Sequence, residues 1–502
     1  MSRQQNGLKS KKNLHGYEEG EKMAIAIDRD LIEDINDPSF DVINFCIEEH
    51  AKEIPRLEML FDYYEGKPHK INKPATKTPH ELDQVFVNNA KYITDMMIGF
   101  TVGAPVSYAG AKGKDITPVT DALEKMQIKK HDKELEKGLS TMGIGLELQY
   151  LAIKPGTEGT ESPETIPKIA WIDPRGMFLV VDDTIERTKL FAVRMVQKRD
   201  LKRDTFWEIT VYTQKNVITY YSKVKRLSKA DLLKRKGEPE IKEHFYQDVP
   251  VVEYRNNEEK QGDYEQQLSQ IDGYNLLQTD RIKDKKNFVK AIMIMFGFGL
   301  PDEEPSEING NMVIEAPAKK DGGDFQFATN TFDESQVQVL ADSLLDDFHK
   351  TTYVPNLNDE NFAGTQSGEA MKYKLFGLLL ALSIKIGYLE DGIMQRLQLL
   401  QNILNVKGNN VDVEGTTIKF KPNLPINRSD IIQQIRDSQE FMPLLISLGW
   451  LDDIDNPQEV IDMLKQQKEE DIKLNQKALG VQAEDSHSDL EENEDEEDEK
   501  DE

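Results

Sequence analysis

The stretch from Thr331 to Asn405 constrains the fold more than any other, because it predicts two helices joined by a polar loop. Residues 333–350 carry apolar side chains at helical spacing. Residues 352–365 contain a proline, three asparagines and a glycine, which predict a loop. Residues 366–405 then predict one helix of about 60 Å, which is unusually long for a compact core. We expect this helix to bend at its glycines, Gly377, Gly387 and Gly392.

Taken alone, this stretch favours a helical hairpin inside a large enzyme. Its second helix is too long for one compact core, so a part that projects from the rest of the protein fits it as well. The stretch does not predict a membrane span. Its apolar run, residues 375–384, lies between Lys374 and Lys385 and is far shorter than the roughly 20 residues that a spanning helix needs.

The net charge of −28 comes partly from the C-terminal end of the chain. Residues 484–502 contain thirteen acids and one lysine, and residues 1–483 still carry a net charge of −16. Like charges repel, and this tail has almost no apolar surface to bury, so we expect it to be disordered. The composition excludes a tight, general nucleic-acid binder, which would be basic. It is compatible with a protein that handles DNA without holding it strongly.

The remaining composition bounds the domain count and the compartment. A chain of 502 residues should hold several domains. Cys46 is the only cysteine, which excludes an intrachain disulfide framework and a cysteine-based zinc site and favours a reducing compartment. Residues 1–12 lack the apolar core of a signal peptide, and we expect residues 1–16 to be disordered.

The period of the hydrophobic pattern changes along the chain and predicts an α+β fold. It predicts helices over residues 25–65, 80–100, 115–142, 263–288, 429–448 and 457–476. It predicts strands at residues 147–153, 168–172, 177–181, 190–197, 207–213, 217–221, 249–254, 291–296, 311–315, 324–327 and 417–420. Residues 223–242 are interpreted as a charged insertion or loop.

No catalytic constellation stands out in the sequence. A nuclease or a packaging ATPase would need a metal-binding carboxylate cluster or a phosphate loop, and neither pattern is present; residues 364–369 resemble a phosphate loop but lack its lysine. The eight histidines are scattered without the spacing of metal ligands. We therefore predict no enzyme, no catalytic residue, no metal site and no cofactor.

Three local patterns occur in a fixed order along the chain. The first is residues 88–95 followed by Gly103-Ala104-Pro105-Val106-Ser107-Tyr108, and the second is residues 249–258 followed by 262–264 and 271–275. The third is residues 361–372. Combined with the order of helix, strand-rich segment, helix, polar loop, long helix and acidic tail, they resemble the portal (head-to-tail connector) proteins of tailed bacteriophages. The resemblance is strongest to the type found in long-tailed phages of Gram-positive hosts.

The resemblance implies a phage portal fold made of named regions. It implies a disordered N-terminus over 1–16, a wing over 17–254 with helices followed by a β-rich part, a first stem helix over 255–287, a small α+β clip over 288–332, a second stem helix over 333–351, a tunnel loop over 352–365, a long kinked helix returning to the wing over 366–424, a helical crown over 425–483 and the acidic tail over 484–502.

The resemblance also implies a function and partners. About twelve or thirteen copies of the chain would form a closed ring at the capsid portal vertex of the virion. Double-stranded DNA would be packaged and ejected through this ring and only weakly bound. The ring would dock the terminase motor and head-tail adaptor proteins, contact capsid and scaffolding proteins, involve no membrane, and assemble in the host cytoplasm. The alternative is an acidic cytoplasmic scaffold or adaptor without a DNA channel, which would stay a monomer or dimer.

The resemblance assigns the tunnel loop to the narrowest part of the channel. Its candidate channel residues are Tyr353, Asn356, Asn358, Asp359, Glu360, Asn361 and Thr365. The loop contains no lysine or arginine, and phosphate contacts dominate the affinity of proteins for DNA, so a ring of such loops suits low-friction passage. The alternative is a polar surface loop that serves solubility.

One basic cluster lies near the predicted junction of stem and clip. It consists of Arg281, Lys283, Lys285, Lys286 and Lys290. These cations would meet DNA or the acidic surface of a neighbouring subunit. A solvated helix end, where cations suit the helix dipole, is an equal alternative.

Overall fold

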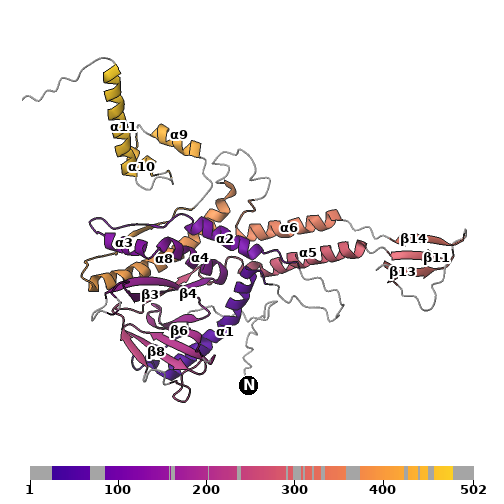
Figure 1. Ribbon diagram of the computed structural model, residues 1–502, viewed down its shortest axis with the longest axis horizontal. Coiled ribbons are helices and arrows are strands. Elements are labelled where there is room, and N and C mark those ends of the chain that lie inside the picture. The colour runs from indigo at the N-terminus through magenta and orange to yellow at the C-terminus, as the bar shows by residue number, and fades with distance from the viewer. Residues whose placement is uncertain are drawn as a thin grey trace, which may run out of the picture. The chain divides into compact units, whose positions relative to one another are not determined.

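The computed structural model of the chain combines helices with small sheets, which confirms the α+β prediction (Figure 1). It describes residues 25–67, 85–157, 159, 164–201, 203–233, 239–289, 292–297, 307–308, 311–318, 322–328, 334–357, 373–422, 428–438, 441–449, 451 and 457–478. The chain divides into two compact units, residues 1–364 with 372–424 and residues 365–371 with 425–502.

Three helices pack against one another in the first unit. They are α1 (Phe40–Glu65), α2 (Asn89–Val102) and α4 (Ile128–Met142). The hydroxyl of Ser39 caps α1 by accepting a hydrogen bond from the backbone N–H of Val42. The helix ends at Gly66, whose left-handed φ of 70° is accessible to glycine without strain.

A six-stranded sheet lies beside α1. In spatial order it contains β1 (Ile25–Ile27), β5 (Met177–Asp182), β6 (Lys189–Arg199), β7 (Thr205–Tyr212), β8 (Asn216–Ser222) and β9 (Glu240–Glu243). β1 is parallel to β5, and the other neighbours are antiparallel. On one face, Phe178 and Val180 of β5 share a core with Ile43 and Ile47 of α1.

The other face of this sheet packs against a three-stranded sheet. That sheet has the order β10 (Val251–Arg255), β3 (Ile144–Ile153) and β4 (Thr165–Ile172), all antiparallel. Met177 and Leu179 of β5 share a core with Leu146 and Leu148 of β3. β5 is therefore buried on both faces, which accounts for its continuous apolar sequence.

Two helices in the first unit lead into a small sheet. α5 (Leu268–Val289) and α6 (Glu334–Thr352) contact each other, and Figure 1 shows them running side by side. Between them in the chain, four strands pair in the order β12 (Glu307–Ile308), β13 (Asn311–Ala316), β11 (Ile292–Phe296) and β14 (Asp324–Ala328). β11 is parallel to β13 and antiparallel to β14.

The longest helix, α8 (Phe376–Val406), packs against β10 and the short helix α3 (Thr117–Lys125). It passes through all three of its glycines as one element, and the bends expected there stay a prediction. At Gly392 a Cβ atom would lie only 2.3 Å from Cδ1 of the buried Tyr254 ring. The glycine thus permits close approach of α8 to β10. After α8, β15 (Thr417–Lys419) pairs with β2 (Ser107–Ala109).

The second unit contains the helices α9 (Arg428–Ser438), α10 (Leu444–Leu448) and α11 (Pro457–Ala478). α10 contacts both of the others. The predicted helix over 429–448 is therefore wrong in its continuity, because α9 ends at Ser438 and α10 begins only at Leu444, after its N-cap residue Pro443. The acidic tail lies outside the described residues.

Other predicted boundaries also need correction. Residues 25–27 form a strand rather than a helix, because they pair with β5. α2 begins at Asn89, since the backbone N–H groups of Val85 and Val87 donate to the side chains of Thr279 and Asn275 on α5. The helix predicted over 115–142 is divided between α3 and α4 at Gln127, whose φ is 58°. Residues 255–287, predicted as the first stem helix, become α-helical only at Leu268, where α5 begins. The short 3-10 helix η2 (Glu265–Gln267) precedes it.

The described helices include none that is both long enough and apolar enough to cross a membrane.

The packing of α8 predicts opposite effects for two glycine substitutions. We expect Gly392→Ala to lower the free energy of unfolding by about 1–3 kcal/mol, because the new methyl group displaces the Tyr254 ring. Gly387→Ala is the matched control: apart from the backbone of the helix itself and the two neighbouring residues, no described atom lies within 4 Å of a Cβ there, so alanine should stabilise the helix by up to about 1 kcal/mol. Thermal unfolding of both variants checks this, and a shift in the same direction for both would contradict it.

Candidate functional site

A cation of α8 lies fully buried between α4 and β3. The side chain of Arg396 is 0% exposed and contacts two carboxylates. Its Nη2 lies 2.9 Å from Asp132 Oδ1 and 2.7 Å from Glu147 Oε2, and its Nε donates to the same Glu147 oxygen at 2.8 Å. A buried charge without a partner costs several kcal/mol, so Arg396 depends on these acids to occupy this position.

Glu147 is the centre of this arrangement. His131 Nε2 lies 2.9 Å from Glu147 Oε2, and the Tyr254 hydroxyl donates to that oxygen at 3.1 Å. Burial raises the pKa of Glu147, but the charges and hydrogen bonds of Arg396 and His131 outweigh burial and bring that pKa down to about 2. For Asp132, burial outweighs the same two neighbours and raises the pKa. The folded structure therefore favours the ionised form of Glu147 beside Arg396.

A second buried cation precedes Arg396 by about three helical turns on α8. Lys385 forms ion pairs with Glu136 of α4 and with Asp263, whose Oδ2 lies 2.8 Å from Nζ. Burial raises the pKa of Glu136 to about 7, against the opposing charge of Lys385. We call Arg396, Lys385 and their partners the buried charge cluster; the partners are His131, Asp132, Glu136, Glu147 and Asp263.

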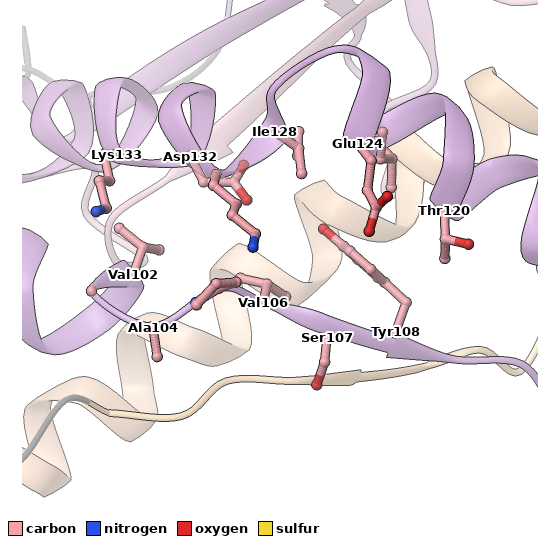
Figure 2. Close-up of a pocket in the computed structure, with 14 residues that line it drawn as sticks. Val102, Ala104, Val106, Ser107, Tyr108, Thr120, Glu124, Ile128, Asp132 and Lys133 are labelled. Atoms are coloured by element: carbon pink, nitrogen blue, oxygen red, sulfur yellow. The ribbon is translucent and has the colours of Figure 1, made fainter. Parts of the chain in front are cut away.

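A pocket of about 310 Å³ adjoins this cluster. It lies between residues 102–108 and the helices α3 and α4, so the predicted Gly103–Tyr108 pattern forms one wall. Figure 2 shows Tyr108 and Glu124 extending toward each other across it. Asp132 also lines the pocket, and burial raises the pKa of Tyr108 to about 12. The pattern that carried the resemblance thus packs beside the acids that hold α8.

The predicted tunnel loop is described only at its beginning. Tyr353 is 58% exposed, whereas the next residue, Val354, is buried. The hydroxyl of Tyr92 on α2 donates to the Pro355 carbonyl at 3.0 Å and accepts from the backbone N–H of Leu357. The loop therefore leaves α6 anchored on α2. Asn356 lies in this part, and the remaining candidate residues lie outside the described residues: Asn358, Asp359, Glu360, Asn361 and Thr365.

The predicted basic cluster is partly neutralised within the chain. Nε of Arg281 donates to Glu334 Oε1 at 2.6 Å, and Nζ of Lys285 lies 3.2 Å from Glu334 Oε2. The hydrogen bond from Arg281 lowers the pKa of Glu334. Lys283 lies 3.6 Å from Asp280 on its own helix. The two pairs with Glu334 join α5 to α6. The side chains of Lys286 and Lys290 lie outside the described residues.

Sequence reasoning missed the buried charge cluster. Its main pair, Arg396 and Glu147, is separated by 249 positions, so no local pattern could reveal the pairing. A signal was nevertheless present, because Lys385 and Arg396 lie on the face of α8 whose other residues are almost all apolar. Among the described residues, no group of three or more His, Cys, Asp or Glu side chains could hold a metal ion.

Two contacting helices are joined through a small sheet, and a polar loop and a long helix packed in the α+β part of the unit follow them. This order of elements agrees with portal proteins, the class that the three sequence patterns indicated. The chain belongs to the family of phage portal proteins described as SPP1 Gp6-like, whose model matches residues 43–474. It is 22% identical to the portal protein of Bacillus phage SPP1 over an alignment of 392 residues. This alignment covers 74% of this chain and 72% of the SPP1 protein.

Family membership confirms the resemblance and does not favour the cytoplasmic adaptor. The protein is a phage portal protein, a structural component that forms a homo-oligomeric ring at the capsid vertex of the virion.

The raised pKa of Glu136 predicts a pH dependence of stability. The unfolded group has its ordinary pKa of 4.5, and the folded group has a pKa of about 7. Between these values the folded state holds a proton that the unfolded state has lost, so this group's contribution to stability falls as pH rises through that window. Glu136→Gln cannot ionise and should gain stability relative to the wild type from about pH 4.5 to 7.

The measurement is chemical unfolding of both proteins over that pH range. Glu134→Gln on the exposed side of α4 is the matched control, because Glu134 is half exposed beside Lys130. The difference in stability between the Glu136→Gln variant and the wild type should change with pH, whereas the control difference should stay constant. A constant difference for both variants would contradict the assignment.

Proposed function

We propose that the ring passes double-stranded DNA in both directions, during packaging and during ejection. The observation that carries this proposal is the pair α5 and α6, which leads at one end to the small sheet and at the other to the loop 352–365. In this proposal residues 17–254 with 366–424 act as wing, 255–287 and 333–351 as stem, 288–332 as clip and 425–483 as crown. The small sheet then docks the terminase motor and, later, the head-tail adaptor proteins.

An exposed apolar stripe on α8 supports contacts between subunits. Phe376, Leu380 and Ile384 recur every fourth residue, and each is more than half exposed in the single chain. Apolar side chains at this spacing form one face of a helix. We assign this stripe to the interface with the neighbouring subunit in a ring of about twelve or thirteen copies.

The contacts of the basic cluster favour a structural role for two of its members. Glu334 engages both Arg281 and Lys285, so their charges serve to hold α5 to α6. Cations neutralised in this way add little to DNA binding, which depends on uncompensated charge facing phosphates. In this proposal the cluster keeps the stem rigid rather than gripping DNA.

The loop 352–365 faces the DNA in this proposal. Its first end is fixed by α6 and by the contacts of Tyr92, while its sequence offers amides, hydroxyls and two acids but no cation. DNA passing such a collar meets weak, exchangeable hydrogen bonds and no strong phosphate contact. The ring contributes no catalysis and no cofactor, contacts capsid and scaffolding proteins, and assembles in the host cytoplasm before it enters the virion.

Charge reversal in the loop tests this proposal. We expect Asp359→Lys with Glu360→Lys to leave ring size unchanged but to slow DNA translocation, because a positive collar adds phosphate contacts. The defect should ease as salt screens those contacts. The measurement is in vitro packaging with rings of verified size across a salt series.

The control variant is Glu469→Lys with Glu470→Lys, an adjacent acid pair exposed on α11 that makes the same change in net charge. The control should package like the wild type. If the loop variant also packages normally at every salt concentration, the loop does not face the DNA.

A further inference from the structure

The first residues of the predicted tunnel loop are bound by side chains of α2 and α6. Nδ1 of His349, near the end of α6, donates to the Val354 carbonyl at 2.9 Å. The Tyr92 hydroxyl of α2 donates to the Pro355 carbonyl at 3.0 Å and accepts from the Leu357 N–H at 3.3 Å. One hydroxyl therefore bridges two backbone groups of the loop and holds them in a fixed arrangement.

The backbone at Tyr353 depends on such contacts. Its φ of 60° lies in the left-handed region, which is unfavourable for a residue with a side chain. A conformation of this kind persists only where the surrounding structure determines it. Here Val354 is fully buried, and the Tyr353 ring lies against Gly377 in the first turn of α8, where a Cβ would be 3.5 Å from Cδ1 of the ring. Neighbouring elements thus set the direction in which the chain leaves α6.

The helix that carries Tyr92 is itself held in place by other contacts. The Asn88 side chain caps α2 by accepting from the Lys91 N–H at 2.9 Å, and it donates to the Tyr64 carbonyl of α1 at 2.9 Å. Two side chains of α5 bind the backbone just before α2. The Tyr92 and His349 rings also meet edge to face, with their centres 5.7 Å apart. Tyr92 therefore connects the loop to α1 and α5 as well as to α6.

We propose that Tyr92 is a positioning residue for the passage of DNA, because its hydroxyl sets the direction in which the predicted tunnel loop leaves α6. This inference rests on the proposed function, in which the loop faces the DNA. Tyr92 acts through the loop and does not itself contact DNA. A ring holds about a dozen copies of the loop around one channel, so a few misdirected copies are enough to obstruct it.

Tyr92→Phe removes the hydroxyl and keeps the ring, so it tests the bridge without creating a large cavity. The Leu357 N–H loses its acceptor, and its hydrogen exchange in assembled rings should accelerate by about tenfold, as expected for the loss of two neutral hydrogen bonds. Tyr264→Phe is the matched control, because the Tyr264 hydroxyl donates to the backbone carbonyl of Leu60 in the same unit. The control should leave exchange at Leu357 unchanged, and equal exchange in the wild type and Tyr92→Phe would overturn the proposal.

In vitro packaging by rings of verified size gives a second, independent readout. Tyr92→Phe should slow DNA translocation by about twofold or more, because the copies of the loop share one channel. Tyr264→Phe rings should package like the wild type. The defect of Tyr92→Phe should be the same at every salt concentration, since the substitution changes no charge. A hydroxyl that only stabilised the fold would lower the melting temperature without slowing packaging, and that result would overturn the proposal.

The charge reversal of Asp359 and Glu360 separates a failure of this inference from a failure of the proposed function. If the charge-reversed loop slows packaging and Tyr92→Phe does not, the loop faces the DNA but Tyr92 does not position it. If neither variant slows packaging, the loop does not face the DNA and both proposals fail. Faster exchange at Leu357 together with a packaging defect that salt does not relieve is the result that the positioning role predicts.

Discussion

The buried ion pairs of α8 are the interaction on which the first unit depends. Arg396 and Lys385 occupy one face of this helix, where apolar residues would pack without an electrostatic cost. Their acids come from α4, from β3 and from the loop before α5, so two side chains fix one helix against three separate parts of the chain. A charge pair tolerates only one register, whereas apolar faces can slide by a turn. The cluster therefore fixes the position of α8 within the first unit.

The same reasoning accounts for how an acidic protein can handle DNA. Buried cations are matched by acids, and two cations of α5 are matched by Glu334. Phosphate contacts accumulate steeply in a ring, so uncompensated cations on each subunit would retard the DNA. Compensation within the chain keeps that attraction small.

Local sequence signals predicted most elements but could not predict their long-range limits. The strands β3 and β7 follow from period-two patterns, β5 and β11 follow from short apolar runs, and α6 and α11 follow from helical patterns. The start of α2 could not be predicted, because it depends on hydrogen bonds to Asn275 and Thr279, which lie 188 and 194 residues along the chain from the residues they bind. The pairing of Arg396 with Glu147 could not be predicted for the same reason, because the two residues lie far apart in the chain. Of the candidate site, the loop and the basic cluster were found from sequence, whereas the partner that neutralises the cluster, Glu334, required the fold.

A double-mutant cycle between Arg396 and Glu147 tests most directly whether these charges hold α8 as a unit. Arg396→Met and Glu147→Gln should each lower the free energy of unfolding by about 3–5 kcal/mol, because each leaves a buried charge without its main partner. The double variant should lose clearly less than the sum, by at least about 1 kcal/mol, since the second change removes the stranded charge. Strictly additive losses, measured by denaturant unfolding, would show that the two residues act independently and would contradict this account.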